Sequence, residues 1–303
     1  MSKSKSFTRS GLLVLCCLAI VAVLLTALPN AQQDAKLNII AFGAHPDDCD
    51  NRAGGVAAKY AALGHRVRFV ALTNGDAGHQ TEGGGALAQR RRAEAREAGR
   101  RIGVEYVVLD NHDGELLPTL EVREQVIRQM RLWKADLVMA PRPNDYHPDH
   151  RYTGILVQDA AYMVTVPNIC PDTPSLRKNP VFVYFQDQFQ KPSPFSPDIA
   201  VSIDDVIEKK YDMLDAHDSQ MYEWLAWHAG NLDKVPKDLK ARKEWLKTQR
   251  RYEPTPAVRQ ALVKWYGAEA AAKVKNSEAF EVCEYGSRPN EADLRRLFPF
   301  FSK

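Results

Sequence analysis

Two short clusters of histidine and aspartate hold the residues of this chain that are best suited to chemistry. The first is AHPDD, from Ala44 to Asp48, and the second is NDYHPDHR, from Asn144 to Arg151. His45 and Asp48 offer an imidazole nitrogen and a carboxylate, a combination that suits zinc. The second cluster adds His147, Asp149 and His150. Because a catalytic zinc needs three protein ligands and an open position, the two clusters together hold enough donors for one such ion.

Asp47 lies between these donors and would be left free beside the metal. A carboxylate in that place can accept a proton from an attacking water molecule. The alternative is that each His-Pro-Asp run is only a turn, since histidine, proline and aspartate are ordinary loop residues. Two such clusters, each directly after an apolar strand, favour a shared site.

The elements that must position these clusters are strands of a parallel sheet. Residues 39–42 are continuously apolar, as expected of a strand that is covered on both faces. Pro46 biases His45 away from helical geometry, so the chain should bend at the carboxyl edge of this strand. Residues 135–140, ADLVMA, form the strand that delivers the second cluster. Ligands bind at this edge in open α/β sheets.

The succession of elements predicts an α/β fold. A helical stripe over residues 52–63 lies between the strand at 39–42 and a second strand, VRFVAL, at 67–72. Such a βαβ unit favours a Rossmann-like, mostly parallel sheet with helices on both faces. From Leu232 to Lys275 the pattern is helical, which predicts a helical C-terminal extension. The order of the strands cannot be read from the sequence.

The two clusters resemble the paired signatures of the LmbE/PIG-L family of zinc-dependent N-acetylglucosaminyl deacetylases. AHPDD matches the first signature and HPDH, from His147 to His150, matches the second. The resemblance extends over most of the chain that follows the amino-terminal leader. It includes TNGDAG (73–78), Arg91-x-x-Glu94, DNHDGEL (110–116) and KKYDMLDAHDSQ (209–220).

The resemblance implies a role for each motif residue. His45, Asp48 and His150 would bind Zn2+, although another divalent metal such as Fe2+ would also suit such a site. Asp47 would act as general base, and His147 would stabilise the oxyanion or serve as acid. One departure is Cys49, where the family usually has glutamate. It is not among the implied ligands, so the site is retained.

Arg91 and Asp113 are the candidates for substrate binding. Arg91 matches an early position of the family's helix, and its planar guanidinium suits a sugar hydroxyl or a phosphate. Asp113 resembles a substrate-contacting carboxylate of the family. The alternatives are a solvated helix face for Arg91 and a turn position before glycine for Asp113.

These assignments predict hydrolysis of an N-acetyl group on an amino sugar of the N-acetylglucosamine type, with a small molecule or glycan as substrate. A second hypothesis is an amidase that acts on a non-sugar amide, because metal-activated water does not select the amine part of the substrate. A third is a carbohydrate-binding protein that has lost catalysis. Intact Asp47 and His147 argue against the third hypothesis.

The amino terminus has the layout of a secretory signal. Lys3, Lys5 and Arg9 precede an apolar run from Leu12 to Leu28. The length of the run lies between that of a signal core and that of a spanning helix, so an uncleaved membrane anchor stays open. We expect residues 1–31 to be a signal peptide or membrane anchor, 36–230 the deacetylase-like domain, and 231–303 a helical extension packed on it. The catalytic part would be exported, to the periplasm or outside the cell.

The charge balance excludes a polybasic surface for nucleic acid. Residues 1–31 hold three of the 41 Lys and Arg and none of the 38 Asp and Glu. The remainder therefore carries 38 of each sign, and the net charge of +3 belongs to the leader. The sequence does not indicate the oligomeric state.

Overall fold

The fold is built on one mixed sheet. The structure is a computed structural model that describes residues 36–301. Within these residues seven strands lie in the order β3-β2-β1-β4-β5-β7-β6. The first five along this order pair in parallel, whereas β7 is antiparallel to both β5 and β6. The strands are β1 (Asn38–Gly43), β2 (Arg66–Thr73), β3 (Glu105–Asn111), β4 (Leu137–Ala140), β5 (Val181–Phe185), β6 (Ile199–Ser202) and β7 (Ser277–Gly286).

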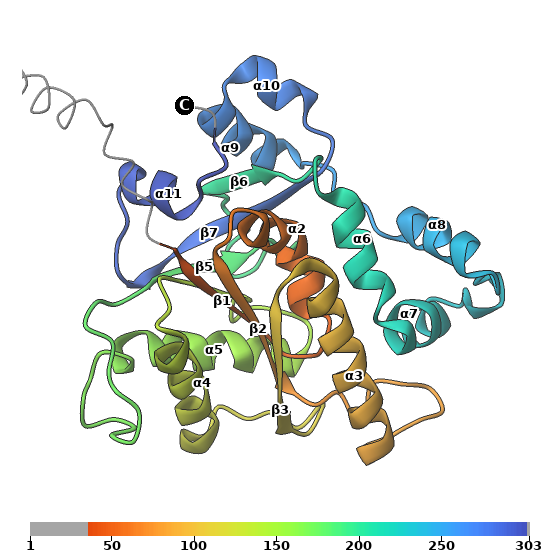
Figure 1. Cartoon of the computed structure of the whole chain (residues 1–303), viewed down its shortest axis with the longest axis horizontal. Coiled ribbons are helices and arrows are strands. Elements are labelled where there is room, and N and C mark those ends of the chain that lie inside the picture. The colour runs from red at the N-terminus through yellow and green to blue at the C-terminus, as the bar shows by residue number, and fades with distance from the viewer. Residues whose placement is uncertain (1–35, 302–303) are drawn as a thin grey trace, which may run out of the picture. The chain divides into compact units, whose positions relative to one another are not determined.

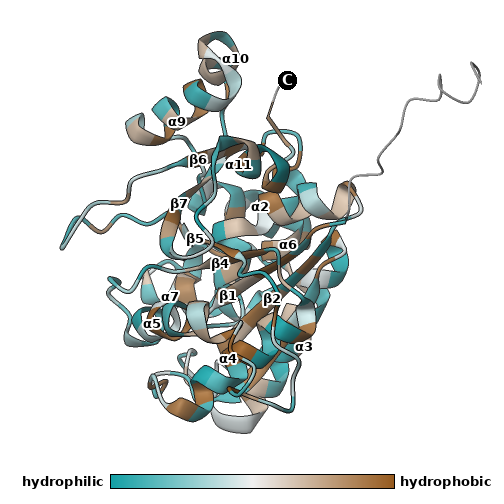
Figure 2. Cartoon of the chain, turned by 90° about the vertical axis from the view of Figure 1, so that its left-hand side faces the viewer, coloured by the Kyte–Doolittle hydropathy of each residue, from teal (hydrophilic) through white to brown (hydrophobic). Residues whose placement is uncertain are grey.

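Helices cover both faces of the sheet (Figure 1). They are α2 (Asp48–Ala62), α3 (Gly84–Ile102), α4 (Leu120–Trp133), α5 (Pro148–Met163), α6 (Ile207–Asp215), α7 (Leu225–His228), α8 (Leu239–Gln249), α9 (Pro256–Tyr266), α10 (Ala268–Lys273) and α11 (Glu291–Leu297), with a π-helix η1 (Ser219–Trp224) and a 3-10 turn η2 (Leu232–Lys234). Ile39 and Ala41 of β1 face α2, α3 and α6, whereas Ile40 and Phe42 face α4 and α5. Figure 2 shows hydrophobic residues concentrated along the central strands. This confirms the predicted parallel α/β architecture with two covered faces.

The strand order brings the two histidine clusters together. β1 pairs directly with β4, so the loops that follow these two parallel strands leave the same edge side by side. The chain runs from β1 outward to β2 and β3, and then returns to β4 and continues to β5 on the other side. The β1–β4 boundary is therefore the topological switch point of the sheet, where α/β proteins bind their ligands.

Strand β7 corrects the prediction for the C-terminal part of the chain. The region 231–303 was expected to be helical, but β7 inserts between β5 and β6 and completes the sheet. Its sequence, SEAFEVCEYG, has glutamates at 278, 281 and 284, a spacing of three that resembles a solvated helix face. In the structure Glu278 is buried instead. The proposed boundary between residues 230 and 231 stays a prediction, but the extension is not purely helical.

Glu278 ties β7 to the helix that carries Asp48. Its carboxylate accepts the backbone N–H groups of Gly55 and Val56 in α2, at 2.8 and 2.7 Å. Lys210 of α6 forms an ion pair with Glu278 and also donates to the backbone oxygen of Asn51, at 2.8 Å. Both charged side chains are fully or almost fully buried. The pair therefore replaces part of the internal hydrogen bonding of α2 and fixes this helix to the sheet.

Replacing Lys210 with methionine is expected to lower the free energy of unfolding by about 3–5 kcal/mol, because Glu278 would keep a buried charge without its cation. Chemical denaturation followed by circular dichroism measures this. Lys59→Met on α2, the helix that the buried pair fixes, is the matched control, since Lys59 pairs with Asp205, whose side chain is 64% exposed. That variant should lose less than about 1 kcal/mol. Equal losses in the two variants would contradict the role given to the buried pair.

The predicted leader, residues 1–31, lies outside the described residues, so a signal peptide or membrane anchor stays a prediction. Between residues 36 and 301 the structure has no helix that is both long and apolar enough to cross a bilayer.

Candidate active site

The first cluster forms a tight turn at the end of β1. Asp48 begins α2 and turns back, so that its Oδ2 accepts the backbone N–H groups of Ala44 and His45 at 2.9 and 2.8 Å. Gly43 makes this turn feasible, because a Cβ atom there would lie 2.7 Å from the Cβ of Asp48. The turn fixes the carboxylate of Asp48 beside the ring of His45.

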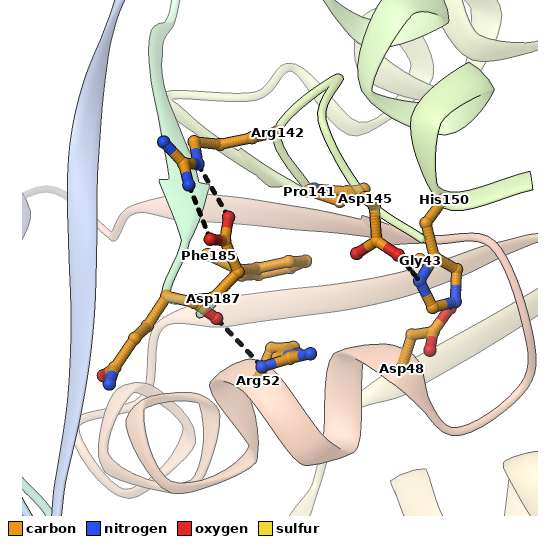
Figure 3. A pocket seen from close by; sticks show the side chains of 10 residues that line it. Gly43, Asp48, Arg52, Pro141, Arg142, Asp145, His150, Phe185 and Asp187 are labelled. Atoms are coloured by element: carbon orange, nitrogen blue, oxygen red, sulfur yellow. Dashed lines mark hydrogen bonds and ion pairs between the residues drawn. The ribbon is translucent and has the colours of Figure 1, made fainter. Parts of the chain in front are cut away.

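The second cluster caps helix α5. His147 is the N-cap residue, and its Nδ1 accepts the backbone N–H of Asp149 at 3.2 Å. Pro148 occupies the first turn, where its missing N–H costs nothing. One turn into the helix, His150 Nδ1 lies 3.1 Å from Asp145 Oδ1. In Figure 3, Asp145 and Asp48 both point toward the ring of His150.

Three donor atoms from the two clusters form a small triangle. His45 Nδ1 lies 3.2 Å from His150 Nε2 and 3.5 Å from Asp48 Oδ2, and the last two atoms are 3.4 Å apart. A tetrahedral zinc ion with bonds of about 2.1 Å separates its ligand atoms by about 3.4 Å. The spacing of the predicted ligand atoms therefore suits one metal ion.

The other nitrogen of His45 faces two carboxylates. His45 Nε2 lies 3.0 Å from Asp113 Oδ1 and 3.4 Å from Asp149 Oδ2. Asp149 is itself held by the backbone N–H of Gly114, at 2.7 Å. His45, Asp113 and Asp149 are close enough to form a second donor group, as are the three histidines of the two clusters. We favour the triangle that includes His45 Nδ1 as the metal site, because a metal-binding histidine normally donates the N–H of its other ring nitrogen to a carboxylate.

The charges of the site also suit a cation. Burial lowers the pKa of His150, but Asp48 and Asp145 outweigh this effect and raise that pKa to about 9. Burial likewise lowers the pKa of His45, and hydrogen bonds to three carboxylates raise it well above the usual value. Burial raises the pKa of Asp48, yet the two histidines bring it well below its usual range. Buried carboxylates thus draw positive charge to the triangle, and a divalent cation can supply it in place of the protons.

Asp47 lies at the cavity surface next to the triangle, with its carboxylate held by Arg91. Arg91 Nη2 is 3.1 Å from Asp47 Oδ1, and Arg91 Nη1 is 3.5 Å from Asp113 Oδ2. Burial raises the pKa of Asp47, although Arg91 acts in the opposite direction. A carboxylate with a raised pKa is a stronger base, which suits proton transfer near neutral pH.

The triangle opens into a cavity of about 690 Å³. His45, Asp47, Asp48, His147 and His150 all line it. Tyr146 of the second cluster also lines it. Further parts of its wall come from residues that were given no role in the sequence analysis, including Gln188, Gln220, Trp224, Leu225, His228 and residues 249–252. A smaller hollow of about 20 Å³ lies on the other side of Asp48 and His150, where Arg142 and Asp187 form a bidentate ion pair (Figure 3).

All seven residues singled out in the sequence line this cavity, but two have contacts that were not foreseen. Arg91 is 2% exposed, so it does not belong to a solvated helix face. It pairs with Asp47, while Asp113 pairs with His45. Substrate contact by Arg91 and Asp113 stays a prediction. Asp145 was missed as the partner of His150, although its place in the second cluster could have indicated it.

Replacing Asp113 with alanine shows whether its carboxylate orients His45 or contacts the substrate. If its carboxylate orients His45, the variant should bind metal about 10–100-fold more weakly, and Asp113→Asn should recover part of this loss. Isothermal titration with zinc gives the affinity. Should the metal affinity stay unchanged while KM rises, Asp113 would act on the substrate and not on His45.

The comparisons with known proteins agree with this site. The family model described as PIG-L, GlcNAc-PI de-N-acetylase, matches residues 40–161, which include both clusters. The diacetylchitobiose deacetylase of Thermococcus kodakarensis is 31% identical over 198 residues, which cover 62% of this chain and 73% of that protein.

Solved structures show the same fold over most of the chain. The N,N'-diacetylchitobiose deacetylase from Pyrococcus horikoshii has a TM-score of 0.61 and 25% identity, covering 93% of this chain and 95% of that one. The 4-carboxy-2-hydroxymuconate hydratase GalB from Pseudomonas putida has a TM-score of 0.62 at 19% identity, covering 84% and 99%. The similarity to GalB concerns the fold alone. Together with the curated relative and the family model, the two clusters lead to one conclusion: this chain belongs to the PIG-L/LmbE family.

Proposed function

We propose that this protein is a metal-dependent deacetylase, a hydrolase of linear amides, that removes the N-acetyl group from an amino sugar of the N-acetylglucosamine type. The triangle formed by His45, Asp48 and His150, with Asp47 beside it in an open cavity, carries the proposal. The similarity to diacetylchitobiose deacetylases supports a sugar as the substrate. Zinc is the proposed metal, since two imidazoles and one carboxylate suit it.

The residues around the triangle have the properties that amide hydrolysis requires. A bound zinc ion supplies Lewis-acid activation of water and of the amide carbonyl. Asp47 would accept the proton of the attacking water, and Arg91 holds its carboxylate in place. The same carboxyl group would then deliver that proton toward the leaving amine.

His147 would donate a hydrogen bond to the carbonyl oxygen of the amide, which becomes negatively charged in the transition state. Because its Nδ1 accepts the backbone N–H of Asp149, the proton of the neutral ring resides on Nε2. Burial, together with His45 and His150, lowers the pKa of His147 and favours this neutral form. A preorganised donor of this kind contributes about 3 kcal/mol to transition-state stabilisation.

Acetate release by the purified full chain tests the proposal. With zinc bound, the protein should release acetate from N-acetylglucosamine and its β-linked oligomers, and not from simple N-acetylated amines or amino acids. Faster release from the non-sugar amides would favour the amidase hypothesis. Binding of the sugars without release of acetate would favour the carbohydrate-binding hypothesis. Metal analysis of the same preparation identifies the ion.

A further inference from the structure

A pair of tryptophans stands beside the cavity, far along the chain from both histidine clusters. Trp224 ends η1 and lines the cavity. Its ring stacks on Trp227 of α7, with the ring centroids 5.4 Å apart and an interplanar angle of 20°. Trp227 is 49% exposed, which is a high value for so large an apolar side chain. A flat aromatic surface therefore adjoins the cavity that holds the donor triangle.

The local backbone fixes this aromatic pair in place. A π-helical turn such as η1 is rare and occurs frequently at functional sites. Gln220 donates from Nε2 to the backbone oxygen of Gly78, at 3.0 Å. Glu223 accepts two hydrogen bonds from Arg90 of α3, at 2.8 and 2.7 Å. Since both anchors lie in the same turn as Trp224, the ring is held in position before any ligand arrives, which lowers the entropic cost of binding.

The chemistry of this wall matches a pyranose ring. Such a ring presents an apolar face of C–H groups and a rim of hydroxyl groups. An aromatic face suits the C–H groups. Gln188, Gln249 and Arg251 line the same cavity and offer planar donors that suit hydroxyl groups. The lining contains little aliphatic surface, from Ala77 and Leu225, so a fatty acyl chain would be covered poorly.

The size of the cavity leaves room beyond the reacting sugar. A volume of about 690 Å³ exceeds that of a single monosaccharide and lies within the range of about 300–1,000 Å³ found for larger ligands. The donor triangle and Trp224 line one continuous space. One sugar ring can therefore present its acetamido group to Asp47 while a linked ring reaches the aromatic wall.

We propose that Trp224, backed by Trp227, is the platform on which a second sugar ring of the substrate stacks. This inference rests on the proposed deacetylation and names the residue that would give a preference for linked sugars. Trp224 acts here as a specificity-determining residue that contacts the part of the substrate that does not react.

The test compares chain lengths in the full-length, zinc-loaded protein. The kcat/KM for acetate release is measured with N-acetylglucosamine and with its β-1,4-linked dimer. The dimer should be preferred, and Trp224→Ala should lower the ratio of the two values by about tenfold. Trp227→Ala should lower it less. A variant that folds poorly loses both activities together, so the ratio is insensitive to folding. Tyr162→Ala, on an exposed tyrosine of α5 outside the cavity lining, should leave the ratio unchanged.

Binding provides a readout that does not depend on turnover. In an Asp47→Asn background, calorimetric titration with the dimer should give a Kd that Trp224→Ala raises about tenfold. An unchanged ratio and an unchanged Kd in Trp224→Ala would overturn the platform. A preference for the monosaccharide, or for an amide with an acyl or peptide group in place of the second ring, would overturn it as well. Dimer binding that depends on Trp224, without acetate release, would refute the deacetylation and retain the platform.

Discussion

Replacing Asp47 with asparagine is expected to lower kcat by about 10²–10⁴-fold while zinc remains bound. The amide is nearly isosteric, and its oxygen can still accept the hydrogen bond from Arg91. It cannot take a proton from water, so the chemical step should lose its base. Because Asp47 is not part of the donor triangle, the metal content should remain at one equivalent per chain.

Acetate release and metal analysis on the same preparation measure both quantities. Asp110→Asn is the matched control, since Asp110 lies near the end of β3 with its side chain 79% exposed and does not line the cavity. That variant should retain near-normal activity. An Asp47→Asn protein with full activity would remove Asp47 from the mechanism. If the metal were lost together with activity, Asp47 would have to be a ligand.

Replacing His150 with alanine should abolish both zinc binding and acetate release. His150 Nε2 is one corner of the triangle, and two remaining donors are too few for a stable zinc site. We expect the purified variant to retain less than about a tenth of the zinc that the unchanged chain holds. Asp48 would then lose one of the two histidines that face its Oδ2.

His112→Ala is the control for this variant. His112 lies near the same edge of the sheet, but its side chain is 67% exposed and pairs with Asp76 outside the triangle. Its removal should leave the zinc content unchanged. If His150→Ala retained a full equivalent of zinc, the metal would have to be bound elsewhere, for example by His45 with Asp113 and Asp149.

The local features of the site could be predicted from the sequence because they depend on short segments. The apolar run at 39–42 marks β1, and Pro46 marks the turn that follows it. The residue types in the two clusters indicate a metal site. The motif resemblance then divided the roles between neighbouring residues such as Asp47 and Asp48.

Other features could not be predicted because they depend on contacts between distant segments. The adjacency of β1 and β4 follows from how helices cover the two faces of the sheet, and no local pattern encodes it. β7 was missed because its regularly spaced glutamates resemble a helix pattern rather than the alternation of a strand. Burial of Glu278 in this strand is feasible only because Lys210, which is distant in the sequence, lies beside it. The aromatic wall depends on a π-helical turn at η1, which has no recognised sequence signal.

Anomalous X-ray scattering at the zinc edge, from crystals of the active zinc-loaded protein, tests the central claim most directly. The account predicts one strong difference peak within bonding distance of His45 Nδ1, Asp48 Oδ2 and His150 Nε2, the three atoms that lie 3.2–3.5 Å apart in the structure. A peak at the Nε2 side of His45, or no peak near the two clusters in a protein that releases acetate, would contradict it.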